Sequence, residues 1–200
     1  MQSQDAKTTL FFASEAATEE ALALPENRPQ AVEQPLHRRE PKQVRATVLF
    51  GDIVGSTERL AAMGDHKWMK VLDAYYAIIH KGFGTFQGIH LSTAGDGFLA
   101  TFDHPVQAIQ CAAAILESVK ELGLRIRFGM HVGECLSVDE FVGGLTVHIG
   151  ARIAAAADAG EVLVSDAVKS HLVDSAIRFV DRGNHDLKGV PGRWRLFTAC

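Results

Sequence analysis

The sequence contains few cysteines, no long apolar run and no run of basic residues, and each absence excludes a class of protein. Cys111, Cys135 and Cys200 lie far apart, so neither a disulfide framework nor a zinc-binding spacing with the nine histidines is indicated. No apolar segment approaches the length of a membrane span. No N-terminal segment has the basic start and cleavage pattern of a signal peptide. We therefore expect a cytoplasmic protein with reduced thiols and no membrane span.

The charge pattern and several missing motifs narrow the choice further. The 20 basic residues are outnumbered by 24 acidic ones, and no long basic block occurs, so a nucleic-acid partner is not expected. The phosphate-binding motifs GxxxxGK[ST] and GxGxxG and the zinc motif HExxH are absent. Hydrophobic residues make up 47% of the chain, which is enough for a substantial core.

Residues 1–43 differ in composition from the rest of the chain. They contain four of the six prolines and the polar stretch PENRPQAVEQPLHRREPKQ, which is typical of a linker. The segment SEAATEEALAL could form one short helix, which Pro25 would end. We predict a partly disordered tail or linker over residues 1–43 and one catalytic domain over residues 44–200.

The hydrophobic pattern from residue 44 onwards predicts alternating strands and helices. Strands are expected over 45–55, 88–93, 97–102, 124–138, 161–165, 176–182 and 194–199, and helices over 56–86 with a break at Gly64, 104–123, 145–160 and 166–173. A hairpin in the middle of this order argues against a purely parallel sheet. We predict an α+β fold with a ferredoxin-like βαββαβ sheet and additional strands and helices.

Two acidic residues stand at the ends of predicted strands. Asp52 ends the first strand in LFGDIVGST, and Asp96 lies at the tip of the central hairpin in LSTAGDGFLATF. In a β-α-β-β unit these positions can meet at one edge of the sheet, where two carboxylates can hold hard cations together with substrate phosphates. Taken singly, Asp96 also suits a tight turn and Asp52 a helix N-cap, so structural roles stay open.

The residues after Asp52 indicate the kind of phosphate chemistry. An aspartyl-nucleophile phosphatase would need a second acid two residues later, but that position is Val54, so this class is set aside. Backbone groups at the start of the following helix could instead approach a triphosphate. The candidates for this contact are Gly55, Ser56 and Thr57.

A second group of candidates lies in the C-terminal half. His148 and Arg152 are four residues apart on a predicted helix and therefore share one face. An arginine beside an alanine-rich packing face is a candidate clamp for a phosphate or an oxyanion, although an ordinary surface salt bridge is the alternative. Lys188 lies in a predicted turn and, taken alone, is typical of a solvated lysine.

Five segments of the sequence occur in order over about residues 44–199. They are ATVLFGDIVGSTERL, STAGDGFLATFDHP, RFGMHVGE, VHIGARIAAAADAGEVLVS and DRGNHDLKGVPGRWRLF. Together they resemble the catalytic domain of class III nucleotidyl cyclases, and the compact bacterial and mycobacterial type most closely. The resemblance implies the class III cyclase fold, ATP as the substrate, and a head-to-tail homodimer with the active site at its interface.

The resemblance also implies a role for each candidate residue. Asp52, Asp96 and the backbone carbonyl of Ile53 would hold two Mg²⁺ or Mn²⁺ ions while the ribose 3′-oxygen attacks the α-phosphate and pyrophosphate leaves. Arg152 from the opposite subunit would stabilise charge on the transferred phosphoryl group, which is a role that electrostatic reasoning also assigns to it. Lys188 would contact the end of the triphosphate.

The positions that read the base depart from the family pattern. Ser92 stands where adenylyl cyclases of the family place a lysine, and His148 replaces a ribose-orienting asparagine. Phe141 stands where they place an aspartate or threonine, with Asp139 or Glu140 as the alternatives for that position. Gly51 is commonly a threonine in this subgroup. The loss of one polar contact costs about 1–3 kcal/mol of binding or discrimination, which weakens base choice without abolishing the chemistry.

We therefore predict an adenylate cyclase with weak turnover or relaxed base choice. The alternative is a catalytically silent cyclase-like domain that binds a nucleotide or dimerises. A guanylate cyclase finds no support, because the acid that would read guanine is also absent at Ser92.

Overall fold

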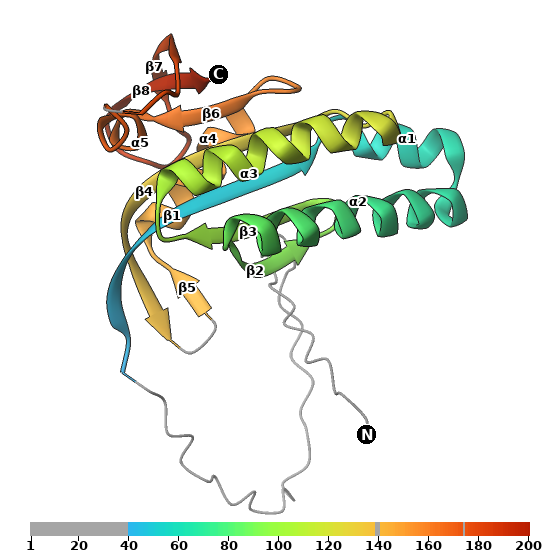
Figure 1. Ribbon diagram of the computed structural model, residues 1–200, viewed down its shortest axis with the longest axis horizontal. Helices are drawn as coiled ribbons and strands as arrows, with labels where there is room; N and C mark the ends of the chain where they lie inside the picture. Colours follow the sequence, from blue (N-terminus) through green and yellow to red (C-terminus); the bar gives the residue numbers. More distant parts are fainter. Residues whose placement is uncertain (1–39, 139–140, 174) are drawn as a thin grey trace, which may run out of the picture.

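The centre of the molecule is a single sheet whose strands follow the order β2-β3-β1-β4-β6-β8-β7, with β5 paired to β4 (Figure 1). This computed structural model describes residues 40–138, 141–173 and 175–200, so the helix expected over 14–24 lies outside the described residues. The strands are β1 (Lys42–Ile53), β2 (Ile89–Ala94), β3 (Gly97–Phe102), β4 (Ile126–Val138), β5 (Phe141–Gly143), β6 (Val162–Ser165), β7 (Phe179–Asp186) and β8 (Arg193–Ala199). The helices are α1 (Ser56–Met63), α2 (Asp65–Phe86), α3 (Pro105–Ser118), the short 3-10 helix η1 (Val119–Leu122), α4 (Leu145–Ala156) and α5 (Asp166–Ser170).

The first four strands confirm the predicted ferredoxin-like unit. They lie in the spatial order β4-β1-β3-β2, and every neighbouring pair is antiparallel. Strand β6 extends the sheet parallel to β4, and β8 and β7 complete it with two antiparallel pairings. The helical connections before β2 and after β3 each pass over one strand, so β2 lies beyond β3 and β4 lies beyond β1, which leaves β1 and β3 in the middle of the unit.

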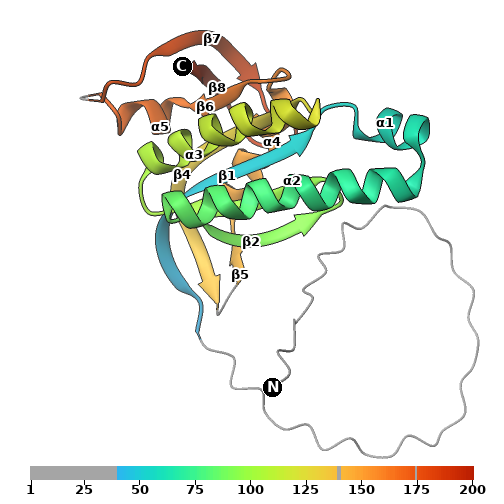
Figure 2. The ribbon, with the colours of Figure 1, turned by 45° about the vertical axis from the view of Figure 1, so that its right-hand side comes forward.

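The two faces of the sheet carry different helices (Figures 1 and 2). Because side chains alternate along a strand, Leu49 of β1 packs into the large core under α2 and α3, whereas Val48 faces the side of α4. Helix α4 lies very close to the sheet. A Cβ atom at Gly129 of β4 would stand 1.9 Å from the backbone nitrogen of Ala154, so this contact requires glycine.

Several element boundaries differ from the sequence-based expectation; for example, β7 spans Phe179–Asp186 where 176–182 was expected, and residues 119–122 of the helix expected over 104–123 form η1. Strand β1 begins at Lys42, because its exposed first residues continue the ladder with β4 without contributing to the core. Helix α4 ends at Ala156, four residues before Gly160, since Ala157 adopts an extended backbone and the Asp158 amide donates to the Glu161 carboxylate. Helix α5 is likewise shorter than expected and ends at Ser170. Within the described part of the chain, no helix combines the length and the apolar character that a membrane crossing needs.

Candidate active site

The structure brings the two predicted carboxylates together at one edge of the sheet. Asp96 lies in the two-residue turn between β2 and β3, where Gly95 has a φ of 63°, in the left-handed region that favours glycine. The backbone amide of Ile53 donates a hydrogen bond of 3.0 Å to Oδ2 of Asp96. This bond joins the hairpin tip to the end of β1, next to Asp52, so the predicted meeting of the two acids is observed.

The end of β1 is tightly packed at one glycine. A Cβ atom at Gly97, next to Asp96, would make only ordinary contacts with β1, 3.6 Å from the Gly51 carbonyl oxygen and 3.8 Å from Cβ of Asp52. A Cβ atom at Gly51 would stand 2.7 Å from the Phe98 ring and 2.8 Å from the Phe128 ring, closer than real Cβ contacts. The departure from threonine at residue 51 therefore goes together with two aromatic rings packed against the β1 backbone.

Asp52 has a partner that sequence reasoning missed. Arg127 of β4 is directly opposite Asp52 in the β1–β4 register, and it binds the carboxylate with two hydrogen bonds, Nε to Oδ1 at 2.7 Å and Nη2 to Oδ2 at 2.9 Å. Its Nη1 also donates to the Ala155 carbonyl of α4 at 3.2 Å. The hydrogen bonds to Asp52 raise the pKa of the Arg127 guanidinium, although partial burial opposes this shift. Asp52 is thus a bidentate ion-pair partner and not a helix N-cap.

A cavity of about 400 Å³ opens beside this ion pair on the α4 side of the sheet. Four of the predicted site residues line it together with Arg127, namely Asp52, Ser92, Phe141 and His148. Much of the remaining wall is apolar, for example Phe50, Leu99 and Val147. The structure therefore places the positions that were predicted to read the base beside one of the two acids. A flat apolar ligand with a polar end would match this lining.

Phe141 presents its ring to this cavity because of the glycine two residues later. A Cβ atom at Gly143 would stand 2.6 Å from Cε1 of Phe141, so the ring lies directly over the glycine backbone. The side chain is 55% exposed, which leaves one face of the ring available to a ligand. Ser92 follows a β-bulge between His90 and Ser92 that shifts the β2–β3 register.

The predicted cationic residues lie apart from the acids. Arg152 and Lys188 do not line the cavity, both are exposed, and neither forms an ion pair within the described ranges. The salt bridge that was the alternative for Arg152 is thus absent from the described residues, and Lys188 lies in the turn after β7.

The predicted phosphate-contacting residues lie at the start of helix α1. The helix begins with Ser56 and Thr57, and Gly55, which precedes it, has a φ of 73°. The Glu58 carboxylate lies 2.7 Å from where a Cβ of Gly55 would stand.

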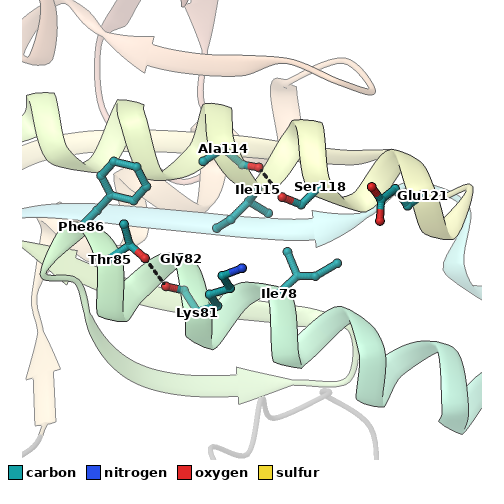
Figure 3. A pocket seen from close by; sticks show the side chains of 9 residues that line it. All are labelled: Ile78, Lys81, Gly82, Thr85, Phe86, Ala114, Ile115, Ser118 and Glu121. Carbon is teal, nitrogen blue, oxygen red and sulfur yellow. Dashed lines mark hydrogen bonds between the residues drawn. The ribbon is translucent and has the colours of Figure 1, made fainter.

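A second hollow lies on the opposite face, between α2 and α3 (Figure 3). It has a volume of about 490 Å³, and its centre is backed by Gly82, whose missing side chain leaves room for Ile115. The hydroxyls that reach it are already bonded to their own helices, Thr85 to the Lys81 carbonyl and Ser118 to the Ala114 carbonyl. Apart from the charged side chains of Lys81 and Glu121, this groove therefore offers little unpaired polar chemistry, unlike the cavity on the α4 side.

The donor set at the acidic edge fits oxygen-seeking cations. It consists of two carboxylates and the nearby Ile53 carbonyl, which suit magnesium or manganese and do not suit zinc. Among the described residues no group of three or more His, Cys, Asp or Glu side chains is placed to hold a metal. The remaining ligands would have to come from water and from phosphates of a substrate, which is usual for magnesium.

The chain matches known proteins in sequence over most of its length. Residues 39–198 match the model of the family described as adenylate and guanylate cyclase catalytic domain. The chain is 27% identical over 162 residues to the Rhizobium meliloti (strain 1021) protein "Putative adenylate cyclase 3", a match that covers 76% of this chain and 28% of the relative. The chain thus spans less than a third of the length of this curated relative.

Solved structures share the fold. The adenylyl cyclase CyaB from P. aeruginosa matches with a TM-score of 0.76 and 24% identity, over 81% of this chain and 96% of that one. The guanylate cyclase domain of RhGC from Catenaria anguillulae, in complex with GTP, matches with a TM-score of 0.72 and 20% identity, over 80% and 98% of the two chains. The fold therefore occurs in structures named for either nucleotide.

Proposed function

Because this chain belongs to the family of adenylate and guanylate cyclase catalytic domains, we propose that it converts ATP into 3′,5′-cyclic AMP and pyrophosphate as a homodimer. The observation that carries this proposal is the meeting of Asp52 and Asp96 at one sheet edge, joined through the Ile53 amide. A phosphoryl-transfer site needs such a pair of oxygen ligands, and the apolar cavity beside Asp52 has room for a nucleoside.

The acidic edge would bind two Mg²⁺ or Mn²⁺ ions through Asp52, Asp96 and the Ile53 carbonyl. Bound ions of this kind polarise the attacking and leaving oxygens of an in-line displacement. The Ile53 amide restrains one carboxylate oxygen of Asp96, and this restraint keeps the acid directed at β1. Ile53 would thus bind one ion through its carbonyl and would hold Asp96, a ligand of the ions, through its amide.

Arg127 would exchange partners when the substrate binds. Its bidentate bond to Asp52 engages both carboxylate oxygens. A triphosphate at this edge brings both cations and anionic oxygens, so Asp52 can turn to the cations and Arg127 to the phosphates. The pair is about one third exposed, so the exchange costs little, on the order of 1 kcal/mol.

The base would occupy the cavity between Ser92 and Phe141. Ser92 can form a single hydrogen bond with a purine edge, and the exposed face of Phe141 can stack on the ring. His148, which lines the same cavity, can donate to a ribose oxygen. These groups read a purine less strictly than a lysine and an acid would, so we expect ATP to be preferred only weakly over GTP.

The second subunit would supply the cationic groups. Arg152 and Lys188 are exposed and lie outside the cavity that Asp52 lines, so in one chain they are not placed to neutralise a triphosphate at the acidic edge. A head-to-tail pair of chains would bring Arg152 of one copy to the Asp52 edge of the other. There the guanidinium would stabilise charge on the transferred phosphoryl group.

The direct test is turnover by the purified chain with Mn²⁺ and either ATP or GTP, with the products separated by chromatography. We expect cyclic AMP, and a smaller amount of cyclic GMP. The Asp96→Asn variant serves as the inactive control. Absence of both cyclic nucleotides, at a protein concentration that sustains dimers, would contradict the enzymatic proposal.

A second candidate function is nucleotide binding without turnover. It is favoured by the ion pair that engages both oxygens of Asp52, together with the altered residues Ser92 and His148. Equilibrium binding of a fluorescent ATP analogue distinguishes the two. A silent domain would bind the analogue and release it unchanged, whereas a cyclase would release pyrophosphate from ATP under the same conditions.

A further inference from the structure

Two consecutive tyrosines of α2 lie behind the hairpin that carries Asp96. The Tyr76 hydroxyl donates to the Gly95 carbonyl at 2.7 Å and also lies 3.3 Å from the Gly97 carbonyl. These two carbonyls flank Asp96 in the chain. One side chain from a helix therefore contacts the backbone on both sides of a single acidic residue.

The turn has few other restraints from outside the hairpin. Its tip is exposed at Gly95, and the only other hydrogen bond to it from outside the hairpin within the described residues is that from the Ile53 amide to the Asp96 carboxylate. The Ile53 bond holds the side chain, whereas the Tyr76 bonds hold the backbone. Without the hydroxyl, the peptide units around Asp96 could rotate while the carboxylate stayed attached.

We propose that Tyr76 is a positioning residue for the metal-binding carboxylate of Asp96, which it orients by clamping the carbonyls of Gly95 and Gly97. This inference rests on the proposed function, because it assigns Asp96 to a divalent cation. Tyr76 acts through the hairpin and touches neither the ion nor the substrate.

The hydroxyl is suited to permanent donation. Burial, and next to it the negative charge of Asp96, raises the pKa of Tyr76 to about 12. The group therefore keeps its proton over the whole pH range in which a cyclase could be assayed. An ionised tyrosine would repel the two carbonyls, so the raised pKa preserves the clamp.

Tyr75 provides a control within the same helix. It is fully buried, and its hydroxyl has no hydrogen-bond partner among the described residues. Burial raises its pKa, and the charges of Tyr76, Asp96 and Asp52 raise it further, so this hydroxyl also lies near the acids. The two tyrosines thus share their helix and their electrostatic surroundings, and differ in whether the hydroxyl is bonded to the hairpin.

The test is a titration of the full chain with Mn²⁺ in the presence of a non-cyclisable ATP analogue, followed by electron paramagnetic resonance of the free ion. We expect Tyr76→Phe to weaken Mn²⁺ binding by about threefold to tenfold, the effect of one lost hydrogen bond. Tyr75→Phe should leave it unchanged. Equal Mn²⁺ affinity in Tyr76→Phe and the unaltered chain, or equal loss in both variants, would overturn the assignment.

A second measurement tests the route through Asp96. In an Asp96→Asn background, Tyr76→Phe should produce no further loss of Mn²⁺ affinity, because the group that the clamp orients no longer carries its charge. An undiminished loss there would overturn the assignment, as would failure of the unaltered chain to bind Mn²⁺. Turnover is not needed for either result, so absence of cyclic nucleotide would contradict the proposed function alone.

Discussion

Asp52 and Asp96 are each held by a hydrogen-bond partner, whereas Arg152 and Lys188 are exposed and have no ion-pair partner within the described residues. The acidic end of the candidate site is thus ordered within one chain, and the cationic end points to solvent. Preorganised groups bind without a cost for ordering them. Exposed arginine and lysine side chains, which are long, are suited to bind phosphates held by a second copy of the chain. The difference favours a site that is completed by a second copy.

The strongest test of this comparison places a substitution at the acidic end in one chain and a substitution at the cationic end in another. Asp52→Ala and Arg152→Ala should each lower turnover by about 100-fold or more, since each removes a group that acts on transition-state charge. An equimolar mixture of the two variants should recover about one quarter of the normal activity, because half of the random dimers would contain one intact site. Cyclic AMP formation at several mixing ratios measures this recovery.

A matched mixture controls for recovery that does not depend on shared sites. Asp52→Ala combined with Asp96→Ala should stay inactive, because both substitutions affect the same end of the site. Recovery in this mixture, or none in the first, would show that the acidic and cationic ends do not come from different chains.

A smaller effect is expected at Ser92 of β2, which we propose contacts the base. Ser92→Lys should lower the KM for ATP about tenfold, because a longer donor replaces a serine in the cavity wall. The matched control is Ile89→Lys on the same strand, which is 60% exposed and does not line the cavity. A similar fall in KM for both variants would indicate a general effect of charge.

A still smaller effect should follow when Asp52 is released from its ion pair with Arg127. Arg127→Gln should strengthen Mn²⁺ binding in the absence of nucleotide by about fivefold, because it removes the competitor that occupies both Asp52 oxygens. The same variant should bind ATP more weakly. Arg125→Gln, an exposed position just before β4, should change neither value. Isothermal titration of each variant tests this, and unchanged Mn²⁺ affinity in Arg127→Gln would refute the competition.

The smallest effect on turnover is expected from His131, a buried residue of β4. Burial lowers its pKa to about 4, while its Nδ1 lies 2.8 Å from the Ser165 hydroxyl. Since the unfolded chain binds a proton near pH 6.5, this contribution to stability is complete above that pH and declines below it. The free energy of unfolding should fall by about 2 kcal/mol from pH 7 to pH 5 through this residue.

Denaturant unfolding at the two pH values measures that term. His131→Gln should reduce the difference between pH 7 and pH 5 by about 2 kcal/mol, since the other histidines contribute equally to both proteins. An unchanged difference would show that His131 does not carry the pH dependence.

The fold and the acidic edge were predictable from sequence because their signals are local. Apolar runs bounded by turn residues mark the central strands, and the short Gly-Asp-Gly turn fixes the pairing of β2 with β3. The partner of Asp52 was not predictable in this way. Arg127 is 75 positions away, and its place opposite Asp52 depends on the β1–β4 register, which no local pattern specifies. The only signal was an arginine that interrupts the apolar run LRIRFGM.

The end of α4 was missed for a related reason. Gly160 marks a turn, and its φ of 87° confirms that it needs glycine, but the helix ends earlier where Ala157 enters the core. Burial of a small side chain is decided by the neighbouring strand and not by the local sequence. Of residues 1–43, which were expected to form the tail, 1–39 lie outside the described part of the chain, so for them the prediction remains a prediction, whereas Lys42 and Gln43 begin β1.

The contact at Gly129 determines how far the candidate site residues of α4 lie from the sheet. Any larger residue there would push α4 outward, since its Cβ would meet the Ala154 backbone at 1.9 Å. His148 and Arg152 would move with the helix, although neither touches residue 129. In the proposed dimer, one added methyl group at residue 129 would thus alter the spacing between the two subunits. A substitution at Gly129 would therefore affect the proposed chemistry although every candidate site residue remained in place.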